Sequence, residues 1–270
     1  MGSWRLRSRT SPALSVTLAQ IEQSWRDQIE DLTLVPLPPF ARLVDSCDPA
    51  RKTAYSHAEV PDPARDAPRY PRVLAEARAY RSGLFARLLI WLVLVQDGSQ
   101  ILHVHMLPSG ARDLGVVSLD LAADPSGHLS AATIDVCPVG WPRRLPGAYS
   151  QALQNLQRQW ALPKPAQAPE WTTKTGSHLC YHARGLSREE DVGAVIKYAV
   201  ALVRYQAHVA RLVTALPAGD ARRRAVLEAQ KSLYQTRLHN GDGREAVEGC
   251  LAGQEMQEYL SVLFPMSVIV

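Results

Sequence analysis

The amino-acid sequence predicts an α+β fold. We expect a central antiparallel sheet of about four to five strands, packed by an N-terminal amphipathic helix and a C-terminal bundle of about three helices. Patterning typical of β-strands persists through several turns only in residues 84–141, whereas the flanking segments are typical of helices and loops. A hydrophobic content of 46% over 270 residues is also ample for a core.

A one-sided helix is predicted near the N-terminus. Ser11 followed by Pro12 is typical of an N-cap and a first helical position. Apolar residues then recur at steps of three and four and form one stripe, which consists of Leu14, Leu18, Ile21, Trp25, Ile29 and Leu32. Pro36, Pro38 and Pro39 end this helix.

The stretch between this helix and the sheet is expected to be mostly irregular. A short helical piece is predicted over Phe40–Cys47, and the polar residues 46–69, with four prolines and no hydrophobic periodicity, predict a long surface loop. A short helix from Pro71 to Arg81 should follow, and Ser82 and Gly83 should end it.

Two hairpins form the predicted sheet. The continuous apolar run Leu88–Val95 indicates a central strand with both faces covered, and the turn at Asp97-Gly98 leads into a strand over Gln100–Leu107. Strands over Gly115–Leu121 and Leu129–Val136 flank a second turn, Asp124-Pro125-Ser126-Gly127. The short connections predict an antiparallel meander.

The remainder of the chain is expected to be mainly helical. A helix over Ala148–Trp160 and a fifth strand over Thr175–Ala183 precede three further helices. These helices are expected from Ser187, in a capping box with Glu190, to about Leu216, from Asp220 to Leu238, and from Arg244 to Leu263. The apolar tail Phe264–Val270 should dock as an edge strand or in a partner's groove.

These elements divide the chain into three predicted segments. Residues 1–69 hold the N-terminal helix and the proline-rich loop, residues 70–183 the sheet body, and residues 184–270 a helical subdomain. We expect the last two to share one continuous core.

Composition narrows the classes of function. The net charge is only +4 and the 30 basic residues are scattered among 26 acidic ones, which argues against nucleic-acid binding. The longest apolar run falls far short of the ~20 residues of a transmembrane helix, and no signal peptide precedes Ser11. The four cysteines form no close pair, so we expect reduced thiols in a cytoplasmic protein, or in one secreted without a signal peptide. No cofactor-binding motif is present, and no cofactor is predicted.

Histidines and a cysteine recur at strand spacing and suggest a metal site. His103 and His105 should project from one face of their strand, as should His178, Cys180 and His182 from theirs. If the two strands were neighbours, these side chains could bind Zn²⁺. The same alternation is also what the wetter face of an edge-side strand shows.

A nucleophilic site is a second alternative, because a thiolate needs an imidazole for activation and a carboxylate to orient that imidazole. The candidates are Cys137, Cys180, His103, His105, Asp120 and Asp135. None of the local signatures that surround a catalytic cysteine is present, and neither are the motifs of the common hydrolase, nucleotide-binding or zinc-protease classes.

Over about the central hundred residues, the pattern VVSLDLAADPSGHLSAATIDVCP followed by HLCYHARGLSREEDVGAVIKYAVAL resembles bacterial effector acetyltransferases of the YopJ type. The resemblance implies a papain-like His-acid-Cys arrangement. Its acid corresponds to Asp135, but its histidine falls on Gly115 and its nucleophile on Asp191 or Val192. The resemblance therefore implies an inactive or altered relative.

The absence of catalytic motifs leads to the first hypothesis, a non-enzymatic protein of bacterial type that acts by protein-protein contact, as an effector or accessory protein. The apolar tail could also support homo-oligomers. The residues expected at an interaction surface are Arg204, Tyr205, Arg211, Tyr234, Phe264 and Met266. An acyltransferase or hydrolase with a Cys-His-acid site, or a zinc-binding protein, is the alternative.

Overall fold

One antiparallel sheet of eight strands organises the part of the chain that the computed structural model describes, namely residues 4–38, 43–45, 73–110, 112–139, 144–168, 172, 175–239 and 254–269. The strands are β1 (Thr33–Val35), β2 (Leu43–Asp45), β3 (Val73–Arg81), β4 (Phe85–Val95), β5 (Gln100–Pro108), β6 (Val116–Ala123), β7 (Leu129–Cys137) and β8 (Tyr181–Arg184). The α-helices are α1 (Pro12–Gln28), α3 (Gly147–Arg158), α5 (Glu189–Leu212), α6 (Ala221–His239) and α8 (Gln254–Leu263), and the 3-10 turns are η1 (Arg7–Arg9) and η2 (Met266–Val268).

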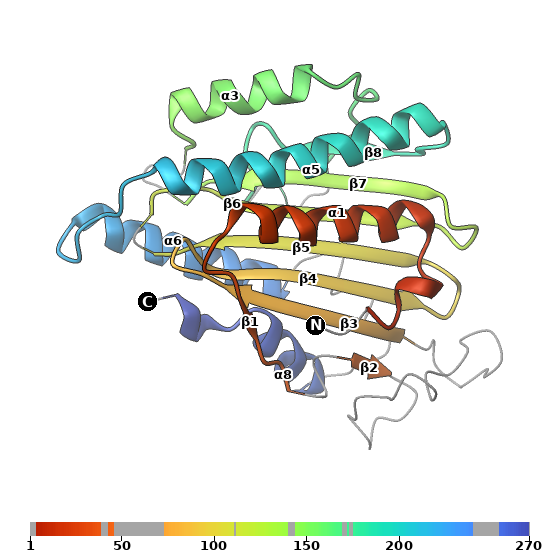
Figure 1. Ribbon diagram of the computed structural model, residues 1–270, viewed down its shortest axis with the longest axis horizontal. Helices are drawn as coiled ribbons and strands as arrows, with labels where there is room; N and C mark the ends of the chain where they lie inside the picture. Colours follow the sequence, from red (N-terminus) through yellow and green to blue (C-terminus); the bar gives the residue numbers. More distant parts are fainter. Residues whose placement is uncertain are drawn as a thin grey trace.

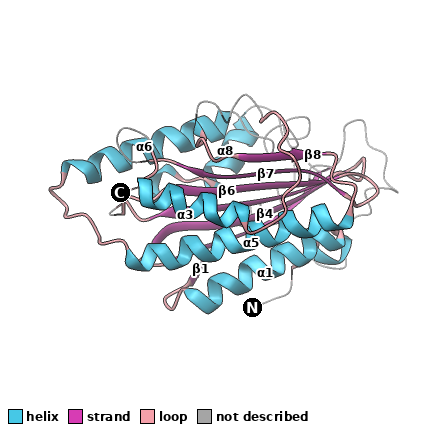
Figure 2. Ribbon diagram, turned by 90° about the horizontal axis from the view of Figure 1, so that it is seen from above, coloured by secondary structure: helices cyan, strands magenta, loops and turns pink. Residues whose placement is uncertain are grey.

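The helices lie in two layers, one on each face of the sheet. The strand order is β1-β3-β4-β5-β6-β7-β8, with β2 also paired to β3. Helices α1, α3 and α5 cover one face, and α6 and α8 cover the other (Figures 1 and 2). The α+β class with a central antiparallel sheet is confirmed, although the described sheet is wider than expected and the C-terminal helices divide between its two faces.

Helix α1 forms as the sequence predicts. Ser11 is its N-cap, and its hydroxyl accepts a hydrogen bond from the backbone N–H of Leu14 at 3.3 Å. The predicted stripe faces the sheet, and Leu14, Leu18, Ile21 and Trp25 are completely buried. Because each fully buried leucine or isoleucine contributes about 1.5–3 kcal/mol, this stripe holds α1 firmly on the sheet.

Two predicted helices are strands instead. Leu43–Asp45 and Val73–Arg81 form β2 and β3, so the helices expected over Phe40–Cys47 and Pro71–Arg81 are wrong within the described residues. In β3 the alanines Ala75, Ala77 and Ala79 favour a helix by intrinsic propensity, but pairing with β4 overrides that preference.

Both hairpins of the predicted meander are present. Strand β4 lies between β3 and β5 and is buried on both faces, as its unbroken apolar run predicted. Gly98 in the β4–β5 turn has a φ of +92°, a conformation that favours glycine. The long polar loop expected over residues 46–69 lies outside the described residues.

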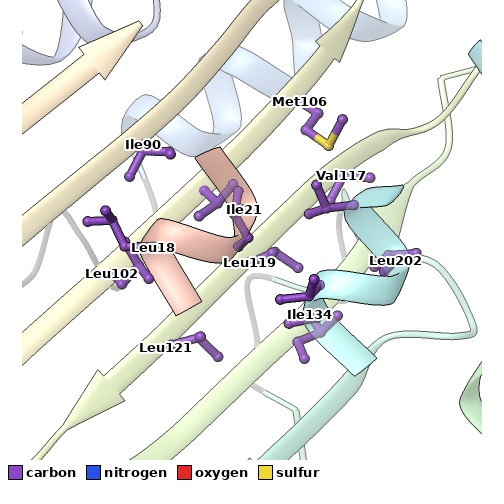
Figure 3. Packing of buried hydrophobic residues seen from close by; sticks show 14 of the residues in the cluster. Leu18, Ile21, Ile90, Leu102, Met106, Val117, Leu119, Leu121, Ile134 and Leu202 are labelled. Carbon is purple, nitrogen blue, oxygen red and sulfur yellow. The ribbon is translucent and has the colours of Figure 1, made fainter. Parts of the chain in front are cut away.

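The face of the sheet under α1 and α5 is a continuous apolar core. Figure 3 shows Leu18 and Ile21 of α1 and Leu202 of α5 above side chains from four strands. Those strand residues include Ile90, Leu102, Met106, Val117, Leu119, Leu121 and Ile134. This face contributes stability and positions the strands that carry the candidate site on the opposite face.

The face under α6 and α8 holds a second core with polar groups inside it. Leu89, Trp91 and Val93 of β4 belong to the same buried cluster as Leu233 and Tyr234 of α6. The tail after α8 turns through η2, and its Phe264 and Ile269 are buried in this core rather than in an edge strand. No described helix is long and apolar enough to cross a bilayer.

Candidate active site

A row of functional side chains crosses the sheet beneath α6 and α8. Residues opposite each other on neighbouring strands point to the same face, so register determines which side chains meet. The cross-strand pairs give the row Trp91, His103, Asp120, Thr133 and His182. All five are buried, so histidines expected on a wetter face lie instead in a central, covered part of the sheet.

His103 and Asp120 form the central contact of this row. Nδ1 of His103 lies 2.5 Å from Oδ1 of Asp120, and both side chains are 6% exposed. The carboxylate holds the imidazole ring in place through this contact. Nε2 of His103 is buried and has no hydrogen-bond partner among the described residues. The pair can therefore hold a proton and present it at Nε2.

The next row places His105 beside this pair. The rings of His103 and His105 are stacked, with centroids 6.0 Å apart and planes 15° apart. From α6, the hydroxyl of Tyr234 lies 3.3 Å from Nδ1 of His105. Burial raises the pKa of Tyr234, and the charge of Arg87 partly opposes that rise.

Aromatic rings enclose the two histidines. The Phe264 ring stands edge-on to both, with centroids 5.6 Å from His103 and 5.7 Å from His105. Trp91 also meets His103 edge-on, with ring centroids 6.2 Å apart. These rings exclude water and lower the local dielectric, which strengthens electrostatic interactions within the site.

Asp135 and Cys137 take part in a different arrangement. Asp135 accepts hydrogen bonds from the backbone N–H of Ser177 at 2.9 Å and from its hydroxyl at 2.6 Å, and so fastens the loop before β8. The Cys137 thiol lies 3.5 Å from Oδ2 of Asp135, and Cys137 pairs with Val116 at the end of β7, outside the row of His103. None of these contacts involves His103 or His105.

The segment around β8 does not assemble the zinc ligands. His182 shares a hydrogen bond with Thr133 at 2.9 Å and accepts one from Arg184 at 3.1 Å, so both ring nitrogens have protein partners. Burial, reinforced by the charge of Arg184, lowers the pKa of His182. His178 is exposed and Cys180 is half-buried. Within the described ranges, no three His, Cys, Asp or Glu side chains come together as a metal site.

The residues expected at an interaction surface are spread over both helical layers. On α5, Arg204 donates to Ser24 of α1 at 3.0 Å, and Tyr205 stacks on Tyr149 at 5.7 Å. Arg211 is exposed and Met266 is half-buried. Tyr234 and Phe264 are buried in the chain's own core and therefore form no surface.

Sequence reasoning missed Arg87, Trp91 and the role of Tyr234 beside His105. Trp91 lies inside the apolar run of β4, where nothing distinguishes it from core residues. The one available signal was its place opposite the first histidine once the tight turn at Gly98 fixes the β4–β5 register.

Proteins of known function resemble this chain in sequence over the part that holds the site. A sequence model described as ferredoxin-dependent bilin reductase matches residues 60–265. The phycocyanobilin:ferredoxin oxidoreductase of Trichodesmium erythraeum (strain IMS101) is 25% identical over 197 residues, 72% of this chain and 77% of that protein. A protein of the same name from Synechococcus sp. (strain CC9902) is 28% identical over 102 residues, 38% of this chain and 40% of that one.

The fold also resembles a solved structure. Phytochromobilin synthase from tomato, in complex with biliverdin, aligns with a TM-score of 0.68 over 94% of this chain and 84% of that chain. At 10% identity, this likeness concerns the fold alone.

Proposed function

The chain belongs to the family of ferredoxin-dependent bilin reductases, and on that premise we propose that it reduces a linear tetrapyrrole of the biliverdin class with electrons from a ferredoxin. Electron transfer from a ferredoxin would make that iron–sulfur protein its physiological partner.

Family membership overturns the first hypothesis drawn from the sequence. A non-enzymatic effector or accessory protein is wrong, because the matched family consists of oxidoreductases. The acyltransferase or hydrolase alternative and the resemblance to YopJ-type acetyltransferases are wrong for the same reason. No short motif in this chain pointed to that class.

The observation that carries the proposal is the buried His103–Asp120 pair. Reduction of a double bond consumes two electrons and two protons, and a ferredoxin supplies only electrons, one at a time. The protein must therefore deliver protons at a defined place. His103 is suited to donate one from Nε2, while Asp120 holds the ring and stabilises its protonated form.

The surroundings of the pair support a flat, conjugated substrate. Rings of Trp91, Phe264 and Tyr234 offer faces and edges against which a tetrapyrrole can pack. Phe264 lies against both histidines, so the substrate would enter as the α8 segment moves away and would be covered when it returns. Excluding water in this way protects an odd-electron intermediate from side reactions.

Purified protein tests this function directly. Biliverdin should bind with a change in its absorption spectrum, and under anoxic conditions a reduced-ferredoxin system should convert it to a product with hydrogen added in pairs, measured by chromatography and mass spectrometry. Omission of ferredoxin should stop the conversion. Neither binding nor ferredoxin-dependent conversion by the intact protein would overturn the proposal.

A further inference from the structure

A second unit that can hold a proton lies next to His103, and the function proposed above gives it no part in proton transfer. His105 is two residues further along β5, and its ring is stacked on that of His103 at 6.0 Å. Its exposed fraction is 0%, so it exchanges protons through protein groups or a bound substrate rather than bulk water. Tyr234 provides such a group, because its hydroxyl lies 3.3 Å from Nδ1 of His105.

Arg87 supplies the charge that this unit needs. Its guanidinium is buried on β4, donates to the backbone carbonyl of Val262 at 2.8 Å, and forms no ion pair with a carboxylate among the described residues. Desolvation lowers the pKa of Arg87, and the neighbouring Tyr234 phenol acts in the opposite direction. A buried cation without a counter-ion favours an anion nearby. It would therefore stabilise Tyr234 after loss of its proton.

We propose that Tyr234 and His105 form a second proton donor of the same site, so that one protein supplies both protons of a two-electron reduction. This inference rests on the proposed bilin reduction. The rings of His103 and His105 lie on one face of β5 with centroids 6.0 Å apart. Two proton donors would therefore meet the same face of the tetrapyrrole.

The proposed transfer balances with the electrons from ferredoxin. Two reduced ferredoxins give one electron each, and His103 gives the first proton. For the second, the O–H bond of Tyr234 breaks as an N–H bond forms at Nδ1 of His105, while the N–H bond at Nε2 breaks as a C–H bond forms on the tetrapyrrole. After the product leaves, Nε2 of His105 takes a proton from solvent as the proton on Nδ1 returns to the tyrosinate, which Arg87 has held until then. The imidazole of His103 also recovers its proton from solvent.

The test is Tyr234→Phe, which removes one oxygen and keeps the ring that packs on Phe264. The matched control is Tyr259→Phe on α8, because Tyr259 is also buried but packs on Trp91 at 5.7 Å. Single turnovers with biliverdin and limiting reduced ferredoxin are followed by absorption and electron paramagnetic resonance. Biliverdin affinity and thermal midpoint, measured for each variant, report folding.

Tyr234→Phe should form the odd-electron bilin at the wild-type rate and consume it about 10²-fold more slowly, the usual range for a lost general acid. The decay in this variant should also accelerate as pH falls, since solvent acid then replaces the donor. Among the described residues, the titratable groups beside His105 are His103, which is paired with Asp120 on the sheet, and Tyr234 on α6, with Arg87 of β4 next to Tyr234. All of them are unchanged in the control.

The proposal of a second donor would be overturned if the odd-electron bilin decayed at the wild-type rate in Tyr234→Phe. It would also be overturned if Tyr259→Phe slowed that decay as much as Tyr234→Phe does. Either result leaves the proposed function intact as long as the wild-type protein reduces biliverdin. Failure of the wild-type protein to do so would instead refute the function itself.

Discussion

His103 on β5 and Asp120 on β6 face each other across the β5–β6 ladder, with 2.5 Å between Nδ1 and Oδ1 and two helices above them. Asp120→Asn should lower the rate of ferredoxin-dependent bilin reduction by about 10²-fold, because the amide keeps the shape of the carboxylate but cannot stabilise a protonated imidazole. The measurement is the single-turnover rate. Biliverdin affinity should change by no more than a few-fold.

Asp135→Asn is the matched control for that substitution. Asp135 is also a buried carboxylate on this face of the sheet, but its oxygens accept hydrogen bonds from Ser177. Its replacement should lower the free energy of unfolding by about 1–3 kcal/mol and leave the reduction rate of the folded protein unchanged. A loss of rate as large as that of Asp120→Asn would show that buried charge, not the His103 contact, matters.

Phe264→Ala should destabilise the fold by about 3–5 kcal/mol, because the ring is 4% exposed and fills the space over His103 and His105. The half-buried Met266, two residues further on, provides the comparison. Met266→Ala should cost about 1 kcal/mol or less. Urea denaturation measures both. Equal small losses would mean that the tail is not part of the core.

The sequence predicts the features of this site that lie within one strand, but not the contacts between distant elements. Strand alternation alone puts His103 and His105 on one face, and both were candidates. That Asp120 lies opposite His103 was not predictable, because the connection between β5 and β6 is too long to fix a register. Nor did the amphipathic helices reveal which face of the sheet they cover, so Tyr234 and Phe264 were expected on a surface.

In the sheet, too, local features were predicted and features that depend on distant contacts were missed. The hairpin turns were predicted because Asp97-Gly98 and Asp124-Pro125-Ser126-Gly127 are typical turn sequences, and such preferences are local. Gly98 and Gly127 both have positive φ values in the structure. Strand β3 was missed because its alanines favour a helix, and because the buried Glu76 and the half-buried Arg78 gain partners from the distant N-terminal segment. Tertiary contacts, unlike turns, leave little trace in a short stretch of sequence.

Glu22 on α1 should make stability depend on acid pH. Burial alone would raise its pKa, but hydrogen bonds from Tyr80 and Trp4 and the charge of Arg78 lower it below its usual range. Because the folded-state pKa is lower, the stabilisation is complete above the unfolded-state pKa near 4.3 and is lost as pH falls through the folded value.

Glu22→Gln should therefore cost about 1–3 kcal/mol at neutral pH, and the difference from the wild-type protein should shrink below about pH 4. Unfolding free energies measured across that range provide the check. Asp27→Asn on the same helix is the control, since Asp27 is exposed and contacts Gln23 alone among the described groups. A Glu22→Gln difference that is constant with pH would contradict the lowered pKa.

Gly115 and Gly193 should respond to alanine in opposite directions. A Cβ at Gly115 would lie 2.5 Å from Cγ1 of Val136 and 2.9 Å from Cδ2 of Leu145, inside a packed region that Gln206 closes by donating to the Gly115 carbonyl at 2.7 Å. Gly115→Ala should therefore cost about 1–3 kcal/mol through overpacking.

Gly193 lies in the first turns of α5, and a Cβ there meets nothing within 4 Å. Gly193→Ala should raise the free energy of unfolding by about 0.5–1 kcal/mol, because alanine loses less backbone entropy in a helix. Urea denaturation of the two variants side by side compares one substitution in two environments. If Gly115→Ala proved neutral, the β6–β7 ladder and the helices over it would be packed more loosely than these distances require, and the alignment of His103 with Asp120 would rest on the strand register alone.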